Sequence, residues 1–133
     1  MTGVKRDVIE PGVWPVVEAA NESGYETISS CEGHPDGKKA AVVFLASNDD
    51  ALRIHVGLKN IRVELLCSWE LHARFLHPTD KWVLAWKLEN WGVKDKEELG
   101  HDDWWTANTE AAQKDVRRVA QLFRECPAKS VGR

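Results

Sequence analysis

The sequence predicts an α+β domain with a four-stranded, largely antiparallel sheet and helices on one face, in the order α-β-β-α-β-β-α. Two observations lead to this prediction. Segments with strand-like apolar patterns occur in pairs joined by turns that contain Pro and Asp, and each pair is flanked by segments with helical apolar spacing. At 133 residues the chain fits a single domain, 1–133, and we expect loose tails at 1–9 and 127–133.

The chain is expected to begin with a helix and a strand. Residues 11–23 are assigned to the helix, with Pro15 near its first turn and Gly24 just beyond its end. Residues 25–32 have a strand-like pattern. The stretch "HPDGKK" that follows has Pro, Asp and Gly in the order of a tight turn.

The next pair of elements is a second strand and a second helix. The run "AAVVFLAS" is apolar at nearly every position, which predicts a strand in the middle of the sheet. Ser47 or Asn48 can cap the helix that follows, because side-chain oxygens of these residues accept hydrogen bonds from free helical N–H groups. Its apolar face is predicted from helical spacing. The residues on that face are Ala51, Ile54, Leu58 and Ile61.

The second half of the chain repeats this pairing of strands before a last helix. Residues 64–75 and 82–89 alternate between apolar and polar side chains and are separated by the turn "HPTDK". An apolar stripe at helical spacing predicts the last helix from about Thr109 to Glu125.

A long connector is expected between the fourth strand and the last helix. The sequence between Asn90 and Thr106 exceeds the usual length of roughly 4 to 6 residues and contains Trp91, Trp104 and Trp105. Two interpretations are open. The tryptophans either pin the connector over the sheet, or they form part of a recognition surface.

Charge and composition limit the classes of function. Eighteen Lys and Arg against 21 Asp and Glu give a net charge of −3, so we regard nucleic acid as an unfavourable partner. No run approaches the ~20 apolar residues of a membrane span. Three widely spaced cysteines do not suit a disulfide framework. We therefore expect a soluble, cytoplasmic protein.

The stretch "ISSCEGHP" suggests three kinds of site, of which the first is catalytic. Cys31 could act as a nucleophile if a histidine drew off its proton. His34 is close in sequence, but residues i and i+3 of an extended strand lie roughly 10 Å apart on opposite faces. The two can meet only if the chain turns at Gly33. Otherwise His72 or His77 would have to serve as the base.

The second kind of site is a zinc site, since Cys31 and His34 have a Cys-x-x-His spacing. Cys67, His72 and His77 are the candidates for further ligands. Cys67 and His72 point to opposite faces of one strand, and no second ligand pair accompanies the first. We therefore assign no metal ligands from the sequence, and the cofactor stays unknown.

The third kind of site is an anion-binding corner. Ser29, Ser30 and the backbone N–H groups around Gly33 could hold a phosphate or carboxylate, because small residues let a ligand approach the main chain. The alternative is a strand end of small residues that only leads into a hairpin.

The segment "YETISSCEGH" resembles the "SSCSGR" region of the wybutosine-synthesising tRNA methyltransferase-like family. Ser29, Ser30, Cys31 and Gly33 match the motif, whereas His34 replaces its arginine and position 32 carries Glu in place of serine. The similarity covers residues from Tyr25 to Ala51, about a fifth of the chain. It implies a related local fold and a tRNA-modifying pocket near the motif.

From these features we predict a small binding or regulatory module that recognises a small anionic ligand or another protein. The expected recognition residues are Ser29, Ser30, Glu32, Gly33, Glu70, His72, Arg74, Trp91, Trp104 and Trp105. The alternatives are an enzyme of hydrolase or transferase type that uses Cys31 and His34, with Glu32 or Glu70 as a third group, and a tRNA-modification protein.

Overall fold

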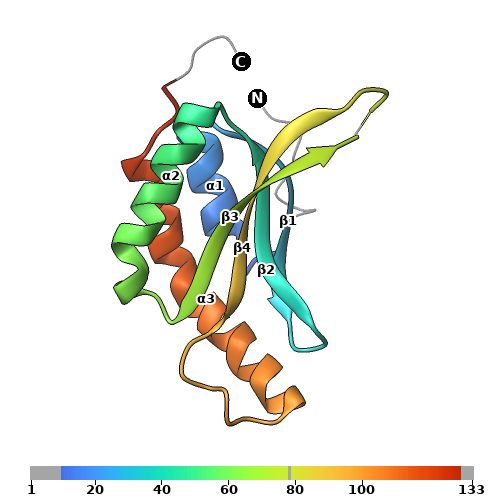
Figure 1. The fold of residues 1–133 in the computed structure, drawn as a ribbon, viewed down its shortest axis with the longest axis vertical. Coiled ribbons are helices and arrows are strands. Elements are labelled where there is room, and N and C mark those ends of the chain that lie inside the picture. The colour runs from blue at the N-terminus through green and yellow to red at the C-terminus, as the bar shows by residue number, and fades with distance from the viewer. Residues whose placement is uncertain (1–9, 78, 130–133) are drawn as a thin grey trace.

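The computed structural model describes residues 10–77 and 79–129, and it has the predicted element order. The helices and strands are α1 (Trp14–Glu22), β1 (Glu26–His34), β2 (Lys38–Leu45), α2 (Asn48–Ile61), β3 (Cys67–Leu76), β4 (Val83–Val93) and α3 (His101–Glu125). Figure 1 shows the three helices gathered on one side of the four-stranded sheet. The predicted α+β class is therefore confirmed.

The sheet is antiparallel throughout, with the strand order β1-β2-β4-β3. The central pair is β2 and β4, so β1 and β3 are the two edges. Because β2 and β4 run in opposite directions, the β1–β2 hairpin and the β3–β4 hairpin lie at opposite ends of the sheet (Figure 1).

One face of the sheet packs against the helices and forms the core. Tyr25, Phe44 and Phe123 meet there edge to face, with ring centroids 5.2 to 5.5 Å apart. Burial of each such side chain contributes on the order of 1.5–3 kcal/mol. Along β2 the alternate residues Ala40, Val42 and Phe44 join this core, as the two-residue period of a strand requires.

A buried carboxylate joins the start of β3 to α3. Asp115 is 3% exposed and accepts hydrogen bonds from the backbone N–H groups of Leu66 and Cys67 and from Nε1 of Trp69, at 2.8 to 2.9 Å. Its desolvation is therefore compensated by three donors. These bonds fix the edge strand of the sheet to the longest helix.

The boundaries in the last third of the chain differ from the prediction. Strand β4 continues to Val93, and α3 begins at His101 rather than near Thr109. Asp102 and Asp103 occupy its first turn, where carboxylates interact favourably with the helix dipole. The predicted long connector was wrong, because only residues 94–100 separate the two elements.

The ends of the described chain are held by hydrogen bonds. Of the predicted tail at 127–133, Ala128 donates its backbone N–H to Ser23 O at 2.8 Å, and Lys129 donates to the Asp50 carboxylate at 3.1 Å. The predicted tail at 1–9 and residues 130–133 lie outside the described residues. Among the helices described, none combines the length and apolar character needed to cross a membrane.

Candidate functional site

Gly33 turns the end of β1. Its φ of +87° is in the left-handed region, and a Cβ at this position would lie 3.0 Å from the backbone nitrogen of Ala40. Only glycine adopts this conformation without strain or close contact. The turn brings the Cys31 sulfur and a ring nitrogen of His34 to the same side of the strand, within 4.8 Å of each other.

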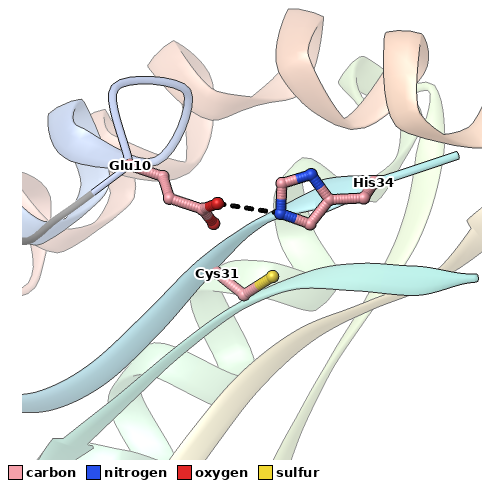
Figure 2. A group of neighbouring side chains, drawn as sticks. All are labelled: Glu10, Cys31 and His34. Carbon is pink, nitrogen blue, oxygen red and sulfur yellow. Dashed lines mark ion pairs between the residues drawn. The ribbon is translucent and has the colours of Figure 1, made fainter. Parts of the chain in front are cut away.

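Glu10 joins these two side chains from the segment before α1. Its Oε2 lies 2.8 Å from Nε2 of His34, while its Oε1 accepts a hydrogen bond of 2.9 Å from the backbone N–H of Glu32 (Figure 2). One ligand-type atom from each of Glu10, Cys31 and His34 lies within 4.8 Å of the others. We call these three residues the edge cluster, because β1 is an edge strand.

The surroundings of the edge cluster set its protonation. Burial is the largest cause that raises the pKa of the Cys31 thiol above its ordinary value, and the Glu10 carboxylate adds to this effect. The backbone N–H of Gly33 donates to the sulfur at 3.4 Å and acts in the opposite sense. The pKa of Glu10 is lowered, mainly by the hydrogen bond from Glu32 and further by His34. At neutral pH the cluster therefore holds a thiol and a carboxylate.

Glu32 was predicted to bind a ligand, but its carboxylate and its carbonyl oxygen accept hydrogen bonds from within the protein. Its carboxylate accepts a hydrogen bond of 2.6 Å from the backbone N–H of Gly12, and its carbonyl oxygen accepts one of 2.7 Å from Gln113 on α3. A Cβ at Gly12 would lie within 2.7 Å of both side chains. Glu32 thus fastens the segment that carries Glu10 against β1.

Beside the edge cluster, the sheet face that turns away from the helices is hollowed. We call this the open face, and no described helix lies over it. The hollow has a volume of about 310 Å³. It is lined by Ser29, Ser30, Cys31, Lys38, Lys39, Ala41, Val43, Lys87 and Glu89. The edge cluster and the hollow share Cys31.

The lining of the hollow combines positive charge with an apolar floor. Ala41 and Val43, on β2, pair with Glu89 and Lys87 on β4. The Lys87 ammonium lies 3.2 Å from the Glu89 carboxylate, which leaves the charges of the other two lysines without a carboxylate in the lining. Lys39 lies over the ring of Trp91, 4.3 Å from its centroid. The hollow therefore favours an anion that also has an apolar part.

Of the other open-face residues predicted from the sequence, Glu70, His72 and Arg74 lie on the far edge strand β3, whereas Trp91 lies on the central strand β4. Nε1 of Trp91 donates to Nε2 of His72 at 2.6 Å, and Glu70 lies 3.7 Å from the ammonium group of Lys59. Arg74 follows on the same strand and is exposed. Strand β3 is three strand positions from β1, which corresponds to roughly 14 Å. The three β3 residues therefore lie away from the edge cluster, and His72 cannot serve Cys31. Trp91 contacts both His72 and Lys39 of the hollow.

His77, Cys67 and the last two tryptophans also lie away from Cys31. The ring of His77 stacks on Trp82 at the opposite end of the sheet, with centroids 4.8 Å apart. Cys67 is buried against α3, and burial, with Asp115 as a further cause, raises its pKa to about 12. Trp104 and Trp105 form an edge-to-face pair on α3 instead of lying on a loop.

A larger hollow of about 420 Å³ lies at the beginning of α2. Two of its charged groups pair with each other: Arg53 lies 2.8 Å from Asp50, and Asp50 also accepts the backbone N–H of Lys129. The next residues along the chain are outside the described part. In the hollow beside Cys31, the charges of Lys38 and Lys39 are not paired with a carboxylate of the lining. This hollow is therefore the stronger candidate for a ligand-binding site.

Several residues of the site were missed from the sequence. Glu10 stands directly before the "PG" that opens the first helix, and no pattern connects it with β1. Lys39 and Lys87 could have been assigned to one face by strand alternation, but their proximity depends on the pairing of β2 with β4.

Comparisons with known family models, curated proteins and solved structures produced no match for this chain. The resemblance to the wybutosine-synthesising tRNA methyltransferase-like family stays a prediction.

Proposed function

We propose that this chain is a small intracellular binding module that takes a small anionic ligand in the hollow of the open face. The observation that carries the proposal is the placement of Lys38, Lys39 and Lys87 around an apolar floor beside Ser29 to Cys31 of β1. An intracellular location agrees with three free cysteines.

The chemistry of the lining favours a particular kind of ligand. Lysine ammonium groups attract carboxylate, sulfonate or phosphate groups and donate hydrogen bonds to them. Ala41 and Val43, 7% and 8% exposed, form the apolar floor that a small ring would contact. The hydroxyl of Ser29, an exposed residue within β1, adds a donor. Phenyl phosphate has this combination of groups and serves as a probe.

Binding of phenyl phosphate can be followed by amide chemical shifts in NMR spectra of the full chain. We expect shifts confined to β1, β2 and β4, and weaker binding of inorganic phosphate, which lacks the apolar ring. A K39M/K87M variant removes two charges and retains the apolar stems, so its affinity for phenyl phosphate should fall at least tenfold. The K96M/K114M variant removes two lysines outside the hollow and is the matched control. Equal losses in both variants would reject the hollow as the binding site.

An enzyme that uses Cys31 and His34 is the second candidate, because the turn at Gly33 brings the two side chains together and Glu10 supplies a third group. The raised pKa of Cys31 opposes this function, since the thiolate is the nucleophilic form. Reaction of Cys31 with iodoacetamide at neutral pH faster than that of free cysteine would support the enzyme and weigh against a simple binding module.

A protein partner is the third candidate, and it would bind at the end of the β3–β4 hairpin. Phe75 is 73% exposed and Trp82 is 68% exposed, which are large apolar areas for a surface. Substitution of both by Ser tests this candidate separately from the hollow. The double variant should keep its affinity for phenyl phosphate and lose binding to any protein that docks on the hairpin.

A further inference from the structure

We propose that the edge cluster of Glu10, Cys31 and His34 binds one divalent transition-metal ion of the zinc class, with a fourth position left for water or a ligand. Among the described residues, 10–77 and 79–129, this is the one set of three His, Cys, Asp or Glu side chains whose donor atoms all lie within 4.8 Å of one another. The inference does not depend on the proposed anion binding, because the metal alone is the ligand.

The donor types select the class of metal. A thiolate sulfur, an imidazole nitrogen and a carboxylate oxygen form a mixed set that suits Zn²⁺ and its neighbours in the first transition row. Mg²⁺ and Ca²⁺ require oxygen ligands and have no affinity for such a sulfur donor. Three protein ligands and one open position are typical of zinc sites that keep a water or substrate.

The present distances are close to those a metal would impose. With Zn–S near 2.3 Å and Zn–N and Zn–O near 2.0–2.1 Å, tetrahedral donors lie roughly 3.3–3.6 Å apart. The contact between His34 and Glu10 is 2.8 Å and must open by about 0.5 Å. No donor pair exceeds 4.8 Å, so none must close by more than about 1.5 Å, which small side-chain rotations accomplish.

Backbone groups already orient two of the ligands. The N–H of Glu32 holds Oε1 of Glu10, which leaves Oε2 directed at the cluster. The N–H of Gly33 points at the Cys31 sulfur, 3.4 Å away, as expected for a group that stabilises a metal-bound thiolate. Glu32 in turn fastens Gly12 and Gln113. These contacts lower the cost of assembling the site.

The charges balance when the metal binds. The Cys31 thiol gives up its proton to the solvent as the sulfur–metal bond forms. Nε2 of His34 carries the proton of its hydrogen bond to Glu10 and releases this proton to the solvent before it binds the metal, so the bound ring is the neutral tautomer protonated at Nδ1. One thiolate, one carboxylate and one neutral imidazole then carry a charge of −2, which neutralises the divalent ion.

Cobalt and zinc titrations of the untagged full chain test the proposal. Co²⁺ should bind at one equivalent and give a sulfur-to-cobalt charge-transfer band, together with the intense visible bands of tetrahedral cobalt. Zn²⁺ should displace it and abolish the bands. Circular dichroism at each step reports whether the chain stays folded.

Variants of the three ligands separate the site from adventitious binding. C31S should eliminate the charge-transfer band, and H34Q and E10Q should each weaken Zn²⁺ binding at least tenfold. C126S, H55Q and E97Q remove the same kinds of group elsewhere and should leave binding unchanged. K39M/K87M should also bind the metal, which distinguishes this site from the anion hollow.

The proposal is overturned if folded protein binds neither ion at one equivalent, or if C31S and H34Q bind as tightly as the wild type. In the first case the cluster has only a structural role, in which Glu10 holds the segment before α1 against β1. In the second case the metal is held by other residues.

Discussion

Nε2 of His34 lies 2.8 Å from Oε2 of Glu10, although the two residues belong to segments that no local pattern connects. The contact exists because β1 turns at Gly33 and because the backbone N–H of Glu32 holds the other carboxylate oxygen. The chemistry at this edge of the sheet thus depends on backbone conformation as much as on the three reactive side chains.

Substitution of Gly33 by Ala should destabilise the protein and disrupt the edge cluster. The added Cβ would be strained at a φ of +87° and would lie 3.0 Å from the Ala40 nitrogen, so we expect a loss of about 1–3 kcal/mol in the free energy of unfolding. Urea denaturation measures this change. G100A is the control, because Gly100 has a φ of −66° and nothing lies within 4 Å of a Cβ there; as the N-cap of α3 this position should lose only about 0.5–1 kcal/mol. Equal stability of G33A and G100A would contradict the role assigned to the turn.

The fold could be predicted from the sequence because the apolar pattern that indicates each helix or strand lies within that element. The alternation along residues 64–75 and 82–89, and the helical spacing from Ala51 to Ile61, each lie within one element. The start of α3 was not predictable in this way, since His101 to Asp103 lie before the apolar stripe from which the helix was predicted. They form a helical turn because Asp102 and Asp103 suit the helix dipole.

The candidate site was predictable only in part. The sequence posed the condition that Gly33 must bend the chain, and the structure meets it. Glu10 escaped the prediction because tertiary contacts with Glu32 place it. The contribution of Lys87 depends on the order of strands in the sheet, which alternation within one strand does not determine.

Cys31 should react slowly with alkylating reagents. Its pKa is raised, first by burial and further by Glu10, so the thiolate fraction at neutral pH is lower than that of a free thiol. Iodoacetamide labelling, read by peptide mass mapping, should give a rate below that of free cysteine and a rise with pH into the alkaline range. E10Q removes one cause of the raised pKa and should accelerate labelling modestly. A wild-type rate above that of free cysteine would be inconsistent with the environment described.

Loss of the Asp115 carboxylate should destabilise the protein more than any surface change. D115A leaves three donors, Leu66 N, Cys67 N and Trp69 Nε1, without their acceptor in the core. We expect a loss of about 3–5 kcal/mol, measured by urea denaturation. E98A removes an exposed carboxylate and should change stability by less than about 0.5 kcal/mol. A small effect of D115A would mean that water replaces the carboxylate without cost.

Glu10 should make the stability of the metal-free protein depend on pH in the acid range. Its folded-state pKa lies below the ordinary value of 4.5, so it stabilises the fold fully above that pH. This contribution is lost as pH falls through the lower, folded-state pKa, because the unfolded chain then binds the proton first.

The E10Q variant keeps an acceptor for the Glu32 N–H but has no charge, so its unfolding free energy should fall less between about pH 5 and 3. Since the Glu10 side chain is 39% exposed, the difference at neutral pH should be at most about 1 kcal/mol. The E97Q variant is the control and should follow the wild type. If the unfolding free energies of wild type and E10Q fell in parallel at acid pH, the charge of Glu10, held by the Glu32 N–H and by His34, would not contribute to folding.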